Sequence, residues 1–139
     1  MIEMLSAIAL FSVVATGLST SIASNMKLSN QSRTIAAATA LVQNKIELIR
    51  LAAPVGNADL TIGPHPPLPN PPITALGGPN GTFTRVWNVT RIPQYLPDGT
   101  TVVGVRPGIV QVAVTVSWST PVAGTLTVVT YACITPDCG

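Results

Sequence analysis

Glu3 carries the only charged side chain among the first 26 residues of the chain. The residues that follow it, from Met4 to Met26, are uncharged and mostly apolar. As a helix this run reaches about 34 Å, enough to cross a bilayer hydrocarbon core of about 30 Å. A carboxylate near the end of such a segment is costly in lipid. We therefore expect Glu3 to have a specific partner, the alternative being an acid that reaches the lipid headgroups.

Cys133 and Cys138 are the only cysteines. Their spacing does not fit the C-x-x-C redox motif, and two thiols without a nearby histidine make a poor zinc site. In an oxidising compartment we expect them to form a disulfide that closes a small C-terminal loop. Because so short a loop gains little chain entropy, we expect the bond to stabilise the tail by about 2 kcal/mol.

The other polar residues form no recognisable catalytic pattern. His65 is the only histidine, and Asp59, Asp98 and Asp137 are isolated along the sequence. No glycine-rich phosphate loop or nucleophile motif is present. The seven Lys and Arg residues are scattered, and the net charge is only +2, which argues against a nucleic-acid partner. We expect a protein that is not an enzyme and that needs neither a cofactor nor a metal ion.

One long helix positions the N-terminal groups. No proline occurs before Pro54, and residues 2–53 are predicted to be helical over about 75 Å. Residues 1–27 form a hydrophobic transmembrane or filament-core segment. Residues 28–53 form an amphipathic half that packs on a sheet. Its core-facing stripe is predicted to consist of Leu28, Ile35, Ala38, Val42, Ile46, Ile49 and Ala53.

The first half of this helix contains a weak point. Gly17 costs about 1 kcal/mol relative to alanine in a helix interior, and a run of hydroxyl residues follows it. In one interpretation the helix unwinds between residues 17 and 25 within an assembly, and the hydroxyl groups bond the freed backbone. In the other, the small residues form a face for close helix packing. The hydroxyl residues concerned are Ser19, Thr20, Ser21 and Ser24.

The remaining sequence divides into a loop and a sheet domain. Residues 54–81 are rich in Pro and Gly and are predicted to be a connecting loop, polyproline-II-like over residues 64–72. Residues 82–139 are predicted to form an antiparallel sheet ending in the cysteine loop. The expected strands cover 82–92, 110–118 and 125–133, with a short extra strand at 101–105. The fold class is therefore α+β, with a long N-terminal helix packed on three or four antiparallel strands.

The opening sequence MIEML at residues 1–5 resembles the start of processed type IV pilins and type II secretion pseudopilins. The stretch ALVQNKIE at residues 40–47 is similar to the sequences found at the end of the long helix in the minor-pilin and minor-pseudopilin branch. The layout of helix, loop, antiparallel sheet and C-terminal cysteine loop is similar too. In that family four residues usually precede the acid, whereas two precede Glu3. We therefore expect this chain to lack the leader and about two mature residues. The helix proline frequent in the family is also absent.

This resemblance implies a structural subunit of a type IV pilus-like extracellular filament that polymerises through its N-terminal helix. Subunits would wait in the inner membrane, be processed by a prepilin peptidase, and be extracted by an assembly platform into a polymer with copies of themselves and other pilins. Glu3 would then pair with the N-terminal ammonium group of a neighbouring subunit. Met1, Ile2, Leu5 and Phe11 would share this assembly surface.

Two alternatives remain open at this stage. One is a minor pseudopilin of a type II secretion pseudopilus, which would be periplasmic. The other is a single-pass membrane-anchored binding domain that does not polymerise.

Overall fold

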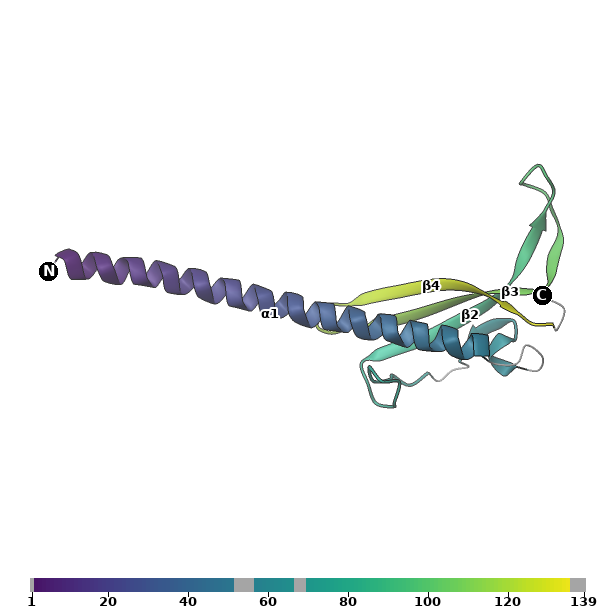
Figure 1. Ribbon diagram of the computed structural model, residues 1–139, viewed down its shortest axis with the longest axis horizontal. Helices are drawn as coiled ribbons and strands as arrows, with labels where there is room; N and C mark the ends of the chain where they lie inside the picture. The colour runs from purple at the N-terminus through teal and green to yellow at the C-terminus, as the bar shows by residue number, and fades with distance from the viewer. Residues whose placement is uncertain (1, 52–56, 67–69, 136–139) are drawn as a thin grey trace. The chain divides into compact units, whose positions relative to one another are not determined.

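The computed structural model describes residues 2–51, 57–66 and 70–135, and within its long helix it describes the side chains of residues 11, 14–16, 18–19 and 21–51 (Figure 1). Helix α1 covers Ile2–Leu51, and a short 3-10 helix, η1, covers Ala58–Leu60. Four strands form one antiparallel sheet in the order β1-β2-β3-β4. They are β1 (Gly63–His65), β2 (Phe83–Tyr95), β3 (Val102–Trp118) and β4 (Gly124–Cys133). The α+β class with one long helix and an antiparallel sheet is confirmed.

The chain forms two compact units, residues 1–35 and residues 36–139. The first consists of the N-terminal part of α1. The second contains the C-terminal part of α1, η1 and the whole sheet. Helix α1 is regular to Leu51, and the predicted end of the helix at residue 53 lies outside the described residues.

The core of the second unit lies between α1 and one face of the sheet. Alternate residues of β3 point to this face, and four of its valines are completely buried, as the alternating sequence predicts. The matching helix residues are Ala38, Leu41, Val42, Ile46 and Ile49. The sheet residues are Phe83, Trp87, Val89, Val110, Val112, Val114 and Val116.

The predicted helix stripe was right in its second part only. Ala38, Val42, Ile46 and Ile49 are buried as expected. Leu28 and Ile35 are 63% and 45% exposed, so their assignment to the core was wrong. The helix residues that pack against the described core begin at Ala37. Helical periodicity shows which side of a helix is apolar, but it does not show how far along the helix a sheet extends.

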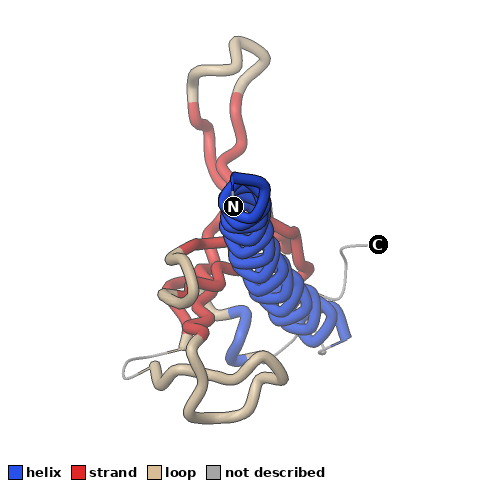
Figure 2. Tube along the Cα trace, turned by 90° about the vertical axis from the view of Figure 1, so that its left-hand side faces the viewer, coloured by secondary structure: helices blue, strands red, loops and turns tan. Residues whose placement is uncertain are grey.

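The strands also differ from the sequence-based prediction. Residues 63–65, predicted to belong to the connecting loop, form β1, which pairs with residues 87–89 of β2. The two strands expected at 101–105 and 110–118 are one continuous strand, β3. The register between β2 and β3 shifts between Arg91 and Pro93 and again between Gln94 and Tyr95. Such irregularities bend a pair of strands locally, and here the two strands stay paired past the core. The ends of β2 and β3 therefore form a two-stranded arm beyond the rest of the sheet (Figures 1 and 2).

Residues 1–27 were predicted to span a membrane. In the part of the chain that the structure describes, no helix combines the length and the apolar character that a membrane crossing requires. Several polar residues between Ser19 and Asn25 reduce the apolar character of this stretch.

Candidate functional site

The predicted assembly residues lie in the first turns of α1. Ile2, Glu3 and Leu5 are helical, but their side chains are outside the described part of the chain, as is Met1 altogether. Phe11 is the one member of this set whose side chain is described, and it is 76% exposed. The structure therefore leaves the pairing of Glu3 as a prediction.

A stripe of larger apolar side chains continues from Phe11 along the helix. Val14, Leu18, Ile22 and Met26 follow one another at intervals of four residues, and each is more than half exposed. With Phe11 they occupy about 120° of the helix circumference at about 100° per residue. Every residue between them from 15 to 25 is Ala, Gly, Ser, Thr or Asn. We call these five residues the apolar stripe.

The sequence-based assignment named only Phe11 from this stripe. The repeat of four was already visible in the sequence and could have revealed the other members. It was overlooked because the small and polar residues between them drew attention to a weak point in the helix.

That weak point is helical in this structure. Helix α1 continues without interruption through Gly17 and the hydroxyl residues that follow. The hydroxyl group of Ser19 donates a hydrogen bond of 2.8 Å to the carbonyl oxygen of Ala15, one turn earlier. This is the kind of side-chain bond that would compete for backbone groups if the helix opened. The proposed unwinding concerns the assembled protein and stays a prediction.

The cysteine pair is only partly within the described residues. Cys133 ends β4, where it pairs with Ile109 of β3. Cys138 lies outside the described residues. The disulfide between them therefore stays a prediction.

An ion pair between a buried lysine and a partly exposed aspartate joins the helix to the loop that follows it. Lys45 is only 5% exposed, and its Nζ atom lies 2.6 Å from Oδ2 of Asp59. The same ammonium group lies 3.6 Å from the centroid of the Trp87 ring, a cation–π contact. The indole Nε1 of Trp87 donates a hydrogen bond of 3.0 Å to the carbonyl oxygen of Asp59. Helix, loop and strand β2 therefore meet at one polar cluster.

Two further residues complete this cluster. The imidazole ring of His65 stacks on Trp87, with ring centroids 5.6 Å apart, and its Nε2 lies 2.8 Å from the carbonyl oxygen of Thr61. Burial lowers the pKa of Arg85, while the negative charge of Asp59 acts in the opposite direction. Asp59 thus faces two cations. The Thr61 hydroxyl lies 3.2 Å from the same Nε2 and donates a hydrogen bond of 2.9 Å to the carbonyl oxygen of Ala58. These bonds join the loop, the helix and the sheet, so the geometry of the cluster suits a structural link between elements.

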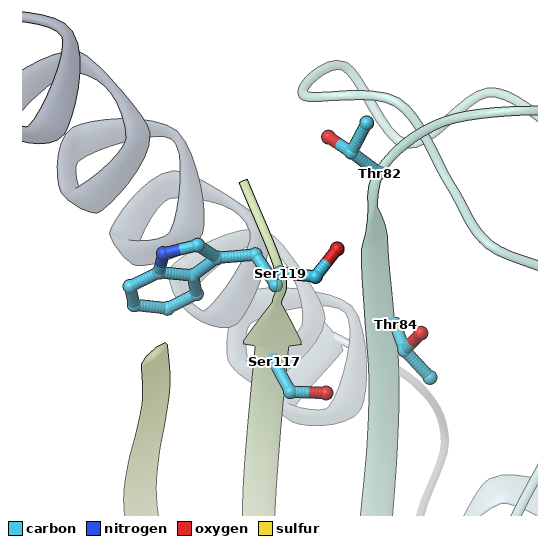
Figure 3. Close-up of a pocket in the computed structure, with 5 residues that line it drawn as sticks. Thr82, Thr84, Ser117 and Ser119 are labelled. Carbon is cyan, nitrogen blue, oxygen red and sulfur yellow. The ribbon is translucent and has the colours of Figure 1, made fainter. Parts of the chain in front are cut away.

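A small pocket lies at the end of the sheet where β2 begins and β3 ends (Figure 3). Its volume is about 240 Å³, and four hydroxyl side chains and one indole line it. Thr84 and Ser117 are direct cross-strand partners. Neutral hydroxyl groups can form hydrogen bonds, but without a base they provide no activated nucleophile. The lining residues are Thr82, Thr84, Ser117, Trp118 and Ser119.

Within the described residues, no three His, Cys, Asp or Glu side chains are grouped so that they could hold a metal ion. Comparison with known proteins adds no assignment, since no family, curated protein or solved structure matches this chain. The apolar stripe and the exposed surfaces of the sheet unit are therefore the features on which a function can be argued.

Proposed function

We propose that this chain is a structural subunit of a type IV pilus-like filament and that it assembles through its N-terminal helix. The observation that carries the proposal is the apolar stripe, in which large apolar side chains at helical spacing are exposed along a helix. A continuous exposed apolar surface of this kind marks an interaction site. The likeness of the N-terminal sequence and of the helix–sheet layout to pilins supports the same reading.

The energetics favour several neighbours over one. Fully burying a side chain of this size contributes about 1.5–3 kcal/mol. The side chains of Val14, Leu18, Ile22 and Met26 are between 56% and 64% exposed, so each would gain about 1–2 kcal/mol from a neighbour. The sum is comparable with the cost of bringing two molecules together. Stable association through this surface therefore calls for contacts with more than one copy, as in a helical polymer.

Glu3 would set the axial register in such a polymer. A carboxylate among apolar helices is tolerable only when it is paired, and the resemblance suggests the N-terminal ammonium group of a neighbour as its partner. Residence in the inner membrane before assembly, the assembly platform, the prepilin peptidase and the other pilins are parts of the proposal that rest on the resemblance alone. The outcome would be an extracellular filament, or a periplasmic one if the subunit serves a secretion pseudopilus.

The test is electron microscopy of sheared filaments with mass spectrometry of their subunits. Glu3→Ala should lower the amount of this chain in filaments at least tenfold while leaving it in the cells. Glu47→Ala is the matched control, because it removes the same charge from an exposed position on the same helix. Wild-type incorporation of Glu3→Ala would refute the pairing. Absence of the wild-type chain from any filament would refute the proposed function and favour an anchored binding domain.

The apolar stripe can be tested in the same way. Leu18→Gln should reduce incorporation, because it places an amide on a surface that is buried in the proposed filament. Ser21→Gln, which lies outside the stripe, should have a smaller effect. Equal incorporation of both variants would show that the stripe does not carry the assembly.

A further inference from the structure

The two outer edges of the sheet differ in how they are covered. At one edge, β1 pairs with residues 87–89 of β2, and Ile73 and Phe83 exchange two backbone hydrogen bonds. The side-chain amide of Asn70 also donates a hydrogen bond to the carbonyl oxygen of Arg85. The other edge is β4, and among the described residues no strand lies beyond it (Figure 1). The sheet therefore has one covered edge and one open edge.

One hydrogen bond shows which backbone groups of β4 face the open edge. The amide of Ile134, directly after β4, donates a bond of 2.8 Å to the carbonyl oxygen of Gly108, and the register between β3 and β4 has no shift. In an antiparallel pair, the backbone groups of alternate residues point toward the partner strand and away from it. The even-numbered residues of β4 therefore bond to β3. The residues between 125 and 131 that point their backbone groups outward are Thr125, Thr127, Val129 and Tyr131.

Strand β4 lacks the features that keep an open edge from pairing. Protected edge strands are short, carry charged side chains, or contain a proline or a bulge. Strand β4 is ten residues long, has neither a charged residue nor a proline, and keeps an unshifted register with β3. Residues 127–129 are exposed one after another, and Val128 is 37% exposed although its side chain shares a face with the buried Thr130. The open edge thus presents an uninterrupted row of backbone donors and acceptors.

We propose that the open edge of β4 binds an extended segment of another polypeptide, which adds to the sheet as a further strand. The spacing of the outward groups selects this kind of partner. One N–H and one C=O recur at every second residue, about 7 Å apart, and an extended backbone presents matching groups with the same repeat. The segment should be uncharged, because a charged side chain beside Val128 or Val129 would lose water without gaining an ionic partner.

A second copy of this chain is the less suitable occupant. Among the described residues, the regular open edge that a copy offers is its own β4, because register shifts, Pro93 and Pro107 interrupt the arm. Two identical edges pair about a two-fold axis with their strands antiparallel. The α1 helices of the two copies would then run in opposite directions, which a filament built through α1 does not allow. The choice of a different polypeptide over a second copy therefore rests on the proposed function.

Amide exchange of the full-length chain in detergent, followed by nuclear magnetic resonance, tests whether the edge is open. The odd-numbered amides from 127 to 131 should exchange at least tenfold faster than the even-numbered amides from 126 to 130, which bond to β3. Equal protection of the two sets would show that the edge is already covered. Protection of the odd-numbered amides that rises with protein concentration would show that a second copy occupies it. Either result would overturn the inference.

The probe for binding is a peptide with the sequence of residues 110–116, VQVAVTV, and a lysine at each end for solubility. In the protein this segment pairs with residues 126–132 of β4, so its side chains suit that strand. We expect the peptide to slow the exchange of the odd-numbered amides at least tenfold. A control peptide with proline in place of residues 113 and 114 loses one donor facing β4 in either orientation, and should bind at least tenfold more weakly. Equal binding of both peptides, or of neither, would contradict strand addition.

Variants of Val129 connect the binding to this edge. Val129→Pro removes an outward donor and no bond to β3, so it should keep the fold and weaken peptide binding at least tenfold. Val129→Thr keeps the amide and the β-branch and should bind like the wild type. Val129→Lys leaves the backbone intact but places a charge beside the added strand, and should also weaken binding. Thermal melting shows which variants are folded, and wild-type binding by a folded Val129→Pro or Val129→Lys would refute the site.

The peptide experiment needs no filament, so the two proposals fail in different ways. Peptide binding at the β4 edge without filaments of the wild-type chain would refute the proposed function and leave the edge as a binding site. Filaments of the wild-type chain without peptide binding would support the proposed function and refute strand addition.

Discussion

The ion pair of Lys45 and Asp59 leads to an asymmetric prediction, in which removing the acid costs more than removing the base. The ammonium group is almost completely buried, whereas the Asp59 side chain is 44% exposed. The loss of stability in each variant therefore depends on whether the charged group that remains is buried or exposed. Without Lys45, the carboxylate can be solvated by water. Without Asp59, a cation stays buried with the face of Trp87 as its remaining described contact.

The magnitude follows from these contacts. Breaking a fully buried pair by removing one partner costs about 3–5 kcal/mol. The half-exposed acid and the cation–π contact reduce this value, whereas the loss of the negative charge beside Arg85 increases it. We expect Asp59→Asn to lower the free energy of unfolding by about 2–3 kcal/mol. Lys45→Met keeps a similar volume over the Trp87 ring, and we expect it to change stability by less than about 1 kcal/mol.

The assay is thermal unfolding of the full-length protein, followed by tryptophan fluorescence and near-ultraviolet circular dichroism. For a unit of about 100 residues, a loss of 2 kcal/mol lowers Tm by about 10 °C. In the double variant, Asp59→Asn should cost clearly less than in the wild type, because the buried Lys45 cation is gone and only Arg85 loses a neighbouring negative charge. An equal or larger loss for Lys45→Met, or an undiminished effect of Asp59→Asn in the double variant, would refute the argument.

Four further predictions concern other parts of the chain. Alkylation before and after reduction should label Cys133 and Cys138 only after reduction, and labelling without a reductant would show that they are not bonded. The pKa of Asp98 lies at about 2, lowered mainly by the hydrogen bonds that its carboxylate accepts from the hydroxyl and the backbone amide of Thr101. Because this pKa is below the unfolded value of about 3.9, the bonds at the arm tip stabilise it above about pH 4 and are lost as the pH falls through 2. Nuclear magnetic resonance of the arm amides should follow that loss, and an unchanged spectrum would contradict it. Gly81→Ala should lower Tm strongly, because the added carbon would overlap the backbone carbonyl group of Ile73; a melting temperature equal to that of the wild type would contradict this. In filaments, the helix should lose regular hydrogen bonding somewhere between residues 17 and 25, and a cryo-electron microscopy map with an unbroken helix there would leave the small residues as a packing face.

Much of the fold follows from local patterns in the sequence. The absence of proline before Pro54 permits one long helix, and the alternation of valines from Val110 to Val116 predicts a half-buried strand. The turn at Asp98 follows from its local sequence. These features depend on neighbours close in the chain, which is why sequence alone determined them. Glu3 is likewise recognised from the sequence, as the only charged residue among the first 26.

Other features depend on contacts between distant segments. Strand β1 forms because its backbone pairs with residues 87–89 of β2, and nothing in the proline-rich loop predicts that partner. Lys45 is buried because Asp59 and Trp87 meet it from another loop and another strand. The arm extends from the sheet because pairing of β2 with β3 continues beyond the core. The charge and periodicity of a sequence indicate whether a residue tends to be buried or exposed. The burial of the Lys45 cation and the exposure of the apolar arm depend in addition on which distant segments the tertiary structure brings into contact with them.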